Sequence, residues 1–283
     1  MLKKIIQLAL LEDDVFNDIT SDLTINKNSV ITFEIKPREQ IIFCGVDIIL
    51  EVFSQLKSHT KFKNTEIELD FFANDGDIVN AGNPIICGRG NAKLIFAAER
   101  VMLNLIQHLS GVATVTQNFV KALNNKKITI LDTRKTLPTL RELEKYAVLC
   151  GGGKNHRLSL SDMILIKDNH IAAAGSIKKA IAAAKKSGKK IEVECDNSTQ
   201  VAEAIIAAPD IIMLDNMNSA ELKKSIALIQ KSKKKIQIEV SGGVNLENIK
   251  NFRTLAIDFI SIGSLTHSAR AVDIGLDINH QKK

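Results

Sequence analysis

The sequence predicts an α/β protein, and two features of its second half carry that prediction. From about residue 128 onward, apolar β-branched runs of strand length alternate with stretches of helical periodicity. The runs are nearly continuous in Ile, Val, Leu and Met, which is typical of strands covered on both faces. Strand followed by helix, six times over, indicates parallel βα units, arranged either as a barrel or as an open doubly wound sheet.

Six segments are predicted to be strands. They are ITILDT (128–133), MILIKD (163–168), KIEVECD (190–196), DIIMLDN (210–216), KIQIEVSGG (235–243) and DFISIGS (258–264). Between them, NSAELKKSIALIQKSK is predicted to form a helix that Asn218 caps. SIKKAIAAAKKSG is predicted to form another, which stops at Gly188.

Residues 1 to about 112 predict a separate α+β domain. The segment 23–45 has the pattern of hairpin strands, and DVFNDIT (14–20) that of a turn rich in Asp and Asn. Turns are expected at Asp75-Gly76 and Ala81-Gly82, within alternating apolar positions. A helix is predicted over 95–123. No low-complexity tract or long linker separates the two parts.

The polar residues at the strand ends indicate what the second half does. Successive strands end at or near Asp132, Lys167, Glu194, Asp215, Ser241 and Gly263. In a βα-barrel these ends converge on one mouth, where active sites are built. One polar strand end can merely begin a loop, but six in succession with both charge signs favour a functional mouth.

Glycine turns after the last two strands suit a phosphate. SGGV places Gly242 and Gly243, and SIGSLTHS places Gly263, after strands and before predicted helices. Glycine lets backbone N–H groups approach an anion, and a helix N-terminus adds the positive end of its dipole. Ordinary tight βα turns are the alternative, and the adjacent pair favours phosphate. GRGNAK and GGGKN match neither a dinucleotide fingerprint nor a P-loop.

Two groups of charged residues complete the predicted mouth. Glu194 and Asp215, on neighbouring strands, form a carboxylate pair that suits sugar hydroxyls or Mg²⁺; neutralisation of each by a nearby lysine is the alternative. The opposite, cationic wall consists of Arg134, Lys135, His156, Arg157 and Lys167. So many cations suit a dicarboxylate or a pyrophosphate. No second His or Cys stands at ligand spacing, so His156 is not expected to bind a metal.

Arg141, Glu142, Glu144 and Lys145 are expected to form a solvated helix face instead. The net charge of +6 also raises the possibility of nucleic acid. However, the lysines gather mostly at helix ends and turns such as 185–190 and 231–235, where solvated charge is the default interpretation. With one Tyr and no Trp, a stacking platform for single strands is poorly supplied. Neither nucleic acid nor a membrane is therefore an expected partner.

The sequence also predicts a cytoplasmic protein. No apolar run approaches the roughly 20 residues that span a bilayer. The N-terminal MLKKIIQLALLEDD lacks a small-residue cleavage site, so it is not a signal peptide. Cys44, Cys87, Cys150 and Cys195 are far apart in the sequence and are expected to be reduced, mostly buried thiols.

Several motifs together resemble one enzyme family. DTRKT, LRELEKYAV, GGGKNHR, LIKDNH, IMLDN, SGGV and LTHS, in this order and spacing, resemble quinolinate phosphoribosyltransferase, the carboxylating nicotinate-nucleotide diphosphorylase. LEDDVFNDIT and AERVMLNLIQHLSGVAT extend the resemblance to nearly the whole chain. It implies an N-terminal α/β sandwich domain over 1–112, to which 270–283 return. It also implies an open α/β-barrel catalytic domain over 113–269, like that of type II phosphoribosyltransferases.

The resemblance implies a reaction as well. A pentosyltransferase of this family moves the phosphoribosyl group of 5-phosphoribosyl 1-pyrophosphate to quinolinate with Mg²⁺, giving nicotinate mononucleotide, pyrophosphate and CO₂ in de novo NAD biosynthesis. The family forms homodimers with shared active sites. A phosphoribosyltransferase for nicotinate or a related aromatic acid is the nearest rival, and the surplus of Arg and Lys favours the dicarboxylate. A nucleic-acid-binding module and a barrel that binds phosphate without catalysis are the others.

Site roles follow from the resemblance, position by position. The quinolinate carboxylates and the pyrophosphate would be bound by Arg100, Thr133, Arg134, Lys135, His156, Arg157 and Lys167. The ribose hydroxyls and Mg²⁺ would be held by Glu194 and Asp215, directly or through water or substrate. The 5-phosphate would be bound by Ser241, Gly242, Gly243, Ile262, Gly263 and Ser264. The catalytic residues would be Lys135, Lys167, Glu194 and Asp215.

Arg100 is expected to act across a dimer interface, because it lies on the helix of the N-terminal domain and the family's dimer places that domain over the partner's barrel. Pairing with Glu99 is the alternative. The chain also departs from the family pattern. Thr139 stands where the family usually has glycine, Val240 where it has alanine, and VF-x-ND where it has LG-x-GD. Thr139 and Val240 affect the predicted loop shape and leave the charged positions intact.

Overall fold

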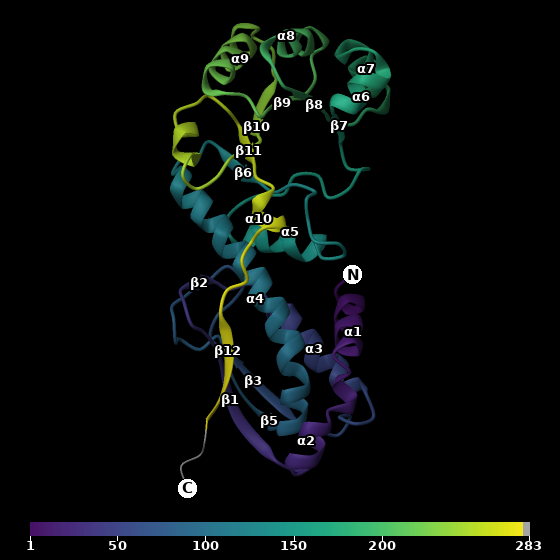
Figure 1. Cartoon of the computed structure of the whole chain (residues 1–283), viewed down its shortest axis with the longest axis vertical. Coiled ribbons are helices and arrows are strands. Elements are labelled where there is room, and N and C mark those ends of the chain that lie inside the picture. The colour runs from purple at the N-terminus through teal and green to yellow at the C-terminus, as the bar shows by residue number, and fades with distance from the viewer. Residues whose placement is uncertain (280–283) are drawn as a thin grey trace. The chain divides into compact units, whose positions relative to one another are not determined.

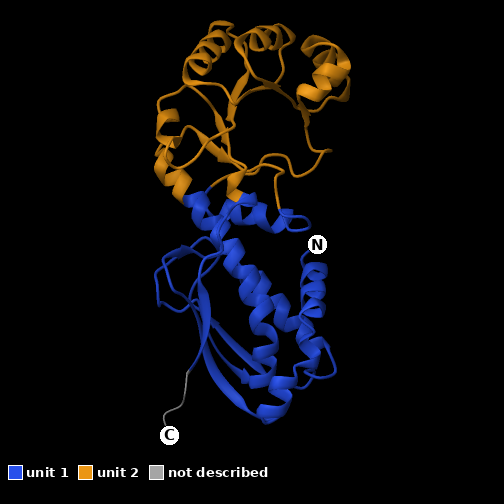
Figure 2. Cartoon of the chain, viewed as in Figure 1, with its two compact units in different colours: residues 1–117, 137–152, 266–283 blue, residues 118–136, 153–265 orange. Residues whose placement is uncertain are grey.

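The computed structural model describes residues 1–279 (Figure 1), and within them the chain forms two compact units (Figure 2). Unit 1 consists of residues 1–117, 137–152 and those from 266 onward, and unit 2 of residues 118–136 and 153–265. The predicted domain boundary at residue 112 falls inside helix α4 (Ala92–Leu123), which contributes to both units. The last part of the predicted segment 270–283, residues 280–283, lies outside the described residues.

Unit 1 is built around an antiparallel sheet. Its strand order is β12-β1-β5-β3. The strands are β1 (Val30–Pro37), β3 (Ile67–Phe71), β5 (Ile86–Asn91) and β12 (Ile274–Asn279). The C-terminal strand β12 pairs with β1 along its whole length, from Thr32↔Asn279 to Pro37↔Ile274. The helices of this unit include α1 (Leu2–Glu12), α3 (Val46–Ser58), most of α4, and α5 (Arg141–Cys150).

The expected hairpin over 23–45 is wrong, although both of its strands exist. β1 pairs with β5 and β12, whereas the short β2 (Ile41–Ile42) pairs with β4 (Ile78–Val79). Both partners of β1 come from distant parts of the chain, so local alternation of apolar residues was no guide to the pairing. The two glycine turns are confirmed, because Gly76 and Gly82 have φ of +92° and +79°.

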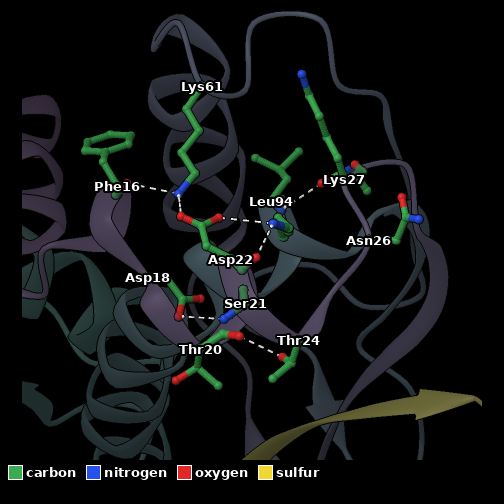
Figure 3. A network of polar contacts seen from close by, with 12 residues as sticks. Phe16, Asp18, Thr20, Ser21, Asp22, Thr24, Asn26, Lys27, Lys61 and Leu94 are labelled. Carbon is green, nitrogen blue, oxygen red and sulfur yellow. Dashed lines mark hydrogen bonds and ion pairs between the residues drawn. The ribbon is translucent and has the colours of Figure 1, made fainter.

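The segment DVFNDIT is helical rather than a plain turn. It forms a 3₁₀ turn (Val15–Asn17) and the start of α2 (Ile19–Thr24), and the Asp18 side chain caps α2 by accepting from the amide of Ser21 at 3.0 Å. One turn later, Asp22 accepts from Lys61 at 2.9 Å (Figure 3). It also accepts from Lys93 at 3.1 Å. The Lys61 ammonium also donates to the carbonyl of Phe16 at 3.0 Å. Asp22 therefore links α2 to α4 and to the segment that follows α3.

The expectation that α5 presents a solvated charged face is wrong for two of its residues. Glu144 is fully buried and Lys145 is 2% exposed. Glu144 lies 2.8 Å from Nε2 of His108 on α4 and also accepts from the amide of Leu137 at 3.1 Å. A carboxylate can be buried when hydrogen bonds satisfy it, and these two contacts do so. Both partners lie outside α5, so the sequence pattern of α5 alone does not reveal them.

Thr139 offers a test of backbone strain in this region. It has φ of +71°, a left-handed conformation that disfavours β-branched residues by about 1–2 kcal/mol. We expect Thr139→Gly to raise the unfolding free energy by about 0.5–1 kcal/mol, since glycine's greater unfolded-state entropy offsets part of the gain. That corresponds to a rise of about 1–4 °C in Tm. Thr139→Ala keeps the Cβ and should gain less; an unchanged or lower Tm for Thr139→Gly would contradict the assignment of strain.

Unit 2 contains the six predicted strands, all parallel. They are β6 (Thr129–Leu131), β7 (Ile164–Ile166), β8 (Ile191–Cys195), β9 (Ile211–Asp215), β10 (Gln237–Ser241) and β11 (Phe259–Ser261). The spatial order is β6-β11-β10-β9-β8-β7. Strands that follow one another in sequence are thus neighbours, except β6 and β7, which form the two edges. The sheet is a barrel left open between β6 and β7, as the resemblance implies.

The predicted helices lie where the sequence places them. α9 (Ser219–Lys231) begins after Asn218, whose side chain accepts from the amides of Ala220 and Glu221. α7 (Ile177–Ala184) continues into a short 3₁₀ turn that stops at Gly188, with φ of +68°. The remaining helices of unit 2 include α6 (Asp168–Ala174), α8 (Ser198–Ala207), and the 3₁₀ turn Ile249–Phe252. Among the described residues, no helix is both long and apolar enough to cross a membrane.

Candidate functional site

A cavity of about 440 Å³ lies at the carboxyl ends of the strands of unit 2. It brings together most of the residues that the sequence predicts for the site. These are Thr133, Arg134, Lys135, His156, Arg157, Lys167, Glu194, Asp215, Ser241, Gly242 and Gly243. They come from five of the six strand ends and from the segment after α5, so the parallel register of the sheet is what gathers them.

Four predicted residues do not line this cavity. Arg100 lies exposed on α4, in unit 1. Ile262 is 2% exposed, and its amide donates to the carbonyl of Leu131 at 2.9 Å, so this N–H already has a partner. Gly263 follows it, and Ser264 begins α10 (Ser264–His267), a helix of only one turn.

The segment GGGKNHR enters the site along the open edge of the barrel. Lys154 forms a parallel bridge with Leu131 of β6, and its amide donates to Ile130 at 2.9 Å. The carboxylate of Asp132 is fully buried and accepts from the side chain of Asn155 at 2.6 Å and the amide of His156 at 2.9 Å. Asp132 therefore anchors the loop that carries His156 and does not itself line the cavity.

The SGG turn after β10 has the geometry of an anion site. Gly242 and Gly243 have φ of +89° and +64°, and a Cβ on Gly242 would lie 2.2 Å from Oδ1 of Asn216. The amides of Gly242 and Gly243 donate to no other residue within the described part of the chain. The predicted helix directly after the turn is absent there: the next element is the 3₁₀ turn Ile249–Phe252. An anion at this turn would thus be bound by glycine amides, with little help from a helix dipole.

Three carboxylates gather at the ends of β8 and β9. One oxygen each of Glu194, Asp196 and Asp215 lies within 4.8 Å of the others. Oxygen-only donor sets suit Mg²⁺, so this cluster fits the ion that the resemblance implies. The expected alternative also holds in part, because Lys167 Nζ pairs with Glu194 at 2.5 Å. Asp215 accepts from the Asn216 side chain at 2.6 Å.

Two guanidinium groups stand on the cationic side. Burial lowers the pKa of Arg157, and the positive charge of Arg134 lowers it further, while Glu192 and Asp162 act in the opposite direction. Like charges in a partly buried site repel each other, and an anionic ligand between them relieves that repulsion. The pair therefore suits a ligand with carboxylates or phosphates.

His156 is oriented differently from the other members of the cationic wall. Its side chain is 8% exposed, and Nε2 lies 2.9 Å from the carboxylate of Glu192. Its Nδ1 accepts from the amide of Arg157 at 2.8 Å. Both ring nitrogens are thus engaged by the protein.

Several residues of the site escaped the sequence analysis. They are Leu165, Asp196, Met213, Asn216, Glu239 and Ser261, with Glu192 behind them. The sequence does mark four of them as facing the site. Each precedes a predicted site residue by two positions: Leu165, Glu192, Met213 and Glu239. Side chains two apart on a strand share a face, so these four point toward the same interior.

Unit 1 contains two other groupings of polar residues. A hollow of about 730 Å³ is lined by Lys27, Lys61, Arg89 and Lys93 together with Asp22, Glu66 and Glu68, so its charges nearly balance. Cys44, Asp75 and Cys150 also lie close together, each offering an atom within 4.8 Å of the others. All four cysteines are free thiols.

Comparisons with known proteins match nearly the whole chain. The family models described as quinolinate phosphoribosyl transferase match residues 18–110 with the N-terminal domain and residues 112–277 with the C-terminal domain. A nicotinate-nucleotide pyrophosphorylase (carboxylating) of Mycobacterium leprae is 39% identical over 276 residues, covering 96% of this chain and 95% of the relative. A probable enzyme of the same name from Bacillus subtilis is 41% identical, covering 98% and 93%.

Solved structures are similar over the same length. The nicotinate-nucleotide pyrophosphorylase from Ehrlichia chaffeensis is 40% identical, with a TM-score of 0.89 and coverage of 98% of both chains.

Proposed function

The chain belongs to the quinolinate phosphoribosyltransferase family, and from this premise we propose that it transfers the phosphoribosyl group of 5-phosphoribosyl 1-pyrophosphate to quinolinate. The products are nicotinate mononucleotide, pyrophosphate and CO₂. One observation carries the proposal: a single cavity is lined by two of the three clustered carboxylates, Glu194 and Asp215, by two guanidinium groups and by a glycine turn. The carboxylates suit the ribose and its Mg²⁺, the guanidinium groups suit a dicarboxylate, and the glycine turn suits the 5-phosphate.

The roles of the residues follow from their chemistry. Arg134 and Arg157 bind the two carboxylates of quinolinate, because the guanidinium fork matches a carboxylate with two parallel hydrogen bonds. Gly242 and Gly243 bind the 5-phosphate through their amides. Glu194 and Asp215, joined by Asp196, hold the ribose hydroxyls and Mg²⁺. Lys135 and Lys167 neutralise the pyrophosphate.

The reaction follows from this arrangement. As the bond between ribose C1 and pyrophosphate breaks, positive charge develops on the ribose, and the nearby carboxylates stabilise it. Mg²⁺, when bound, supplies charge neutralisation for the leaving pyrophosphate. The ring nitrogen of quinolinate attacks C1 and becomes cationic. When the neighbouring carboxylate leaves as CO₂, the electron pair stays on the ring carbon beside the positive nitrogen, whose charge stabilises it. That carbon then takes a proton from solvent to give nicotinate mononucleotide, so no organic cofactor is needed.

A phosphoribosyltransferase for nicotinate or a related aromatic acid is the nearest alternative. The proximity of Arg134 and Arg157 favours a dicarboxylate, since a monocarboxylate would leave one guanidinium without an anionic partner. The direct test is to incubate the protein with phosphoribosyl pyrophosphate, Mg²⁺ and either quinolinate or nicotinate. Nicotinate mononucleotide from quinolinate supports the proposal, and turnover of nicotinate alone would refute it.

We further propose a homodimer in which Arg100 completes the partner's site. Arg100 is exposed on α4 and is not among the residues that line the cavity of unit 2. Burial raises the pKa of the adjacent Glu99, whereas Arg100 acts to lower it, so a local role beside Glu99 is the alternative. A two-fold dimer makes both sites composite, each drawing on both chains. A cytoplasmic location remains a prediction.

Subunit complementation distinguishes the two roles of Arg100. Inactive Arg100→Ala is mixed with inactive Glu194→Ala under conditions that exchange subunits. If Arg100 acts in trans, each mixed dimer has one intact site, and activity should recover to roughly a quarter of wild type. If it acts in cis, every site keeps one lesion and the mixture stays inactive. Each variant incubated alone is the control.

A further inference from the structure

Two buried glutamates, one lining the cavity and one behind it, have no evident part in the reaction. Glu192 on β8 and Glu239 on β10 are both fully buried. Burying a carboxylate is costly unless it is hydrogen-bonded or neutralised. Within the described part of the chain, neither oxygen of Glu239 has a hydrogen-bond partner, whereas Glu192 uses one oxygen to contact His156. Their burial therefore calls for a function.

The contacts of His156 identify its tautomer. The amide of Arg157 donates to Nδ1, so Nδ1 must carry a lone pair and no proton. The proton of the neutral ring then resides on Nε2, which donates to Oε2 of Glu192 at 2.9 Å. The second carboxylate, Glu239, is 3.7 Å from the same nitrogen. The ring thus connects a buried carboxylate to the backbone of a residue in the proposed quinolinate site.

The surroundings of Glu239 disfavour a negative charge on its carboxyl group. Burial raises the pKa of Glu239 well above its ordinary value, and the negative charge of Glu192 raises it further. Of the two carboxylates, only that of Glu192 lies within hydrogen-bond distance of Nε2 of His156, because Glu239 is 3.7 Å from that nitrogen.

We propose that Glu192 is a positioning residue: it holds His156 as the Nε2–H tautomer, so that Nδ1 binds the Arg157 amide and fixes the Arg157 side chain toward the substrate. His156 thereby acts through Arg157, and its ring nitrogens do not contact quinolinate. This inference rests on the proposed function, because it assigns Arg157 to a quinolinate carboxylate. The same change at Glu144, another fully buried carboxylate that contacts Nε2 of a histidine but lies in unit 1, provides a matched control.

The kinetic test compares Glu192→Gln with Glu144→Gln. At position 192 the amide can present either its oxygen or its NH₂ to the ring, so the preference for the Nε2–H tautomer is lost. We expect the KM for quinolinate to rise by about tenfold, as for other lost supporting contacts, with the KM for phosphoribosyl pyrophosphate nearly unchanged. Glu144 contacts Nε2 of His108 in unit 1 and does not line the cavity, so Glu144→Gln should leave the quinolinate KM nearly unchanged. Thermal unfolding of both variants checks that each is folded.

The spectroscopic test is independent of turnover. The ¹⁵N signals of His156 are identified by their loss in His156→Asn, and long-range ¹H–¹⁵N spectra report which ring nitrogen carries the proton. We expect the Nε2–H tautomer in the wild type and a mixture of tautomers in Glu192→Gln. An imidazolium or an Nδ1–H ring in the wild type would overturn the inference, as would an unchanged quinolinate KM in Glu192→Gln. A wild type that shows the Nε2–H tautomer but does not turn over quinolinate would instead refute the proposed function.

Discussion

Replacing Arg157 with lysine should lower kcat/KM for quinolinate by at least about 30-fold, although the positive charge is kept. Loss of one partner from a buried, hydrogen-bonded charge pair costs about 2–5 kcal/mol. A single ammonium does not reproduce the two parallel hydrogen bonds that a guanidinium makes with a carboxylate. Arg157 is partly buried near Arg134, so its side chain has little freedom to compensate.

The matched control for this prediction is Arg270→Lys. Arg270 is 85% exposed and pairs loosely with Glu39 at 3.5 Å. The same chemical change there should leave the kinetics as they are, since exposed ion pairs contribute little. Steady-state kinetics with quinolinate varied at saturating phosphoribosyl pyrophosphate measure the effect. Near-normal kcat/KM in Arg157→Lys would remove Arg157 from the quinolinate site.

Neutralising Glu194 or Asp215 should weaken the binding of phosphoribosyl pyrophosphate much more than the binding of quinolinate. We expect Glu194→Gln and Asp215→Asn to fold normally and to lose about 10- to 100-fold in affinity for phosphoribosyl pyrophosphate with Mg²⁺. The physical reason is the loss of an oxygen donor from the cluster of Glu194, Asp196 and Asp215. Isothermal titration calorimetry of each ligand separately measures both affinities.

The sign of the change in affinity for phosphoribosyl pyrophosphate distinguishes loss of an oxygen donor from a simple change in charge, because Lys167 pairs with Glu194. Glu194→Gln therefore leaves the cavity with one more uncompensated positive charge. If anion attraction alone governed binding, phosphoribosyl pyrophosphate would bind more tightly to this variant. The proposal predicts weaker binding, with quinolinate affinity unchanged or increased. Glu247→Gln, at an exposed position, controls for the change in net charge. Unchanged sugar-phosphate affinity in both site variants would refute the assignment.

The strands of unit 2 could be predicted because each is a short, nearly unbroken apolar run. Ile211–Asp215, for example, lies inside the predicted 210–216, and Ile191–Cys195 inside 190–196. In parallel βα units the register of the strands brings their ends together. The sequence alone therefore places the side chains at those ends, such as Lys167 and Asp215, in one mouth.

Other features depended on contacts that no local pattern contains. β1 takes its partners from β5 and β12, and Glu144 is buried because His108 of α4 reaches it. Glu192 and Glu239 were overlooked for a different reason. A charged residue in the middle of an apolar strand is usually expected to face solvent. However, each of these glutamates lies two positions before a site residue at the strand end, and side chains two positions apart share a face, so both point into the barrel.

The roles of individual site residues were also beyond prediction from residue type. The sequence places His156 among the cations, but its position between Glu192 and the Arg157 amide makes it a hydrogen-bonded support. The helix after the SGG turn was expected from the usual order of βα units, yet only a 3₁₀ turn follows. Both corrections concern hydrogen-bond geometry, which depends on the folded backbone.

The most direct measurement of the central claim uses quinolinate labelled with ¹⁴C in the carboxyl group next to the ring nitrogen. The purified protein is incubated with this substrate, phosphoribosyl pyrophosphate and Mg²⁺, and CO₂, pyrophosphate and nicotinate mononucleotide are quantified together. The proposal predicts that the label appears in CO₂, in equal molar amounts with pyrophosphate and unlabelled nicotinate mononucleotide. Pyrophosphate release without labelled CO₂, or no turnover of quinolinate by folded protein, would contradict it.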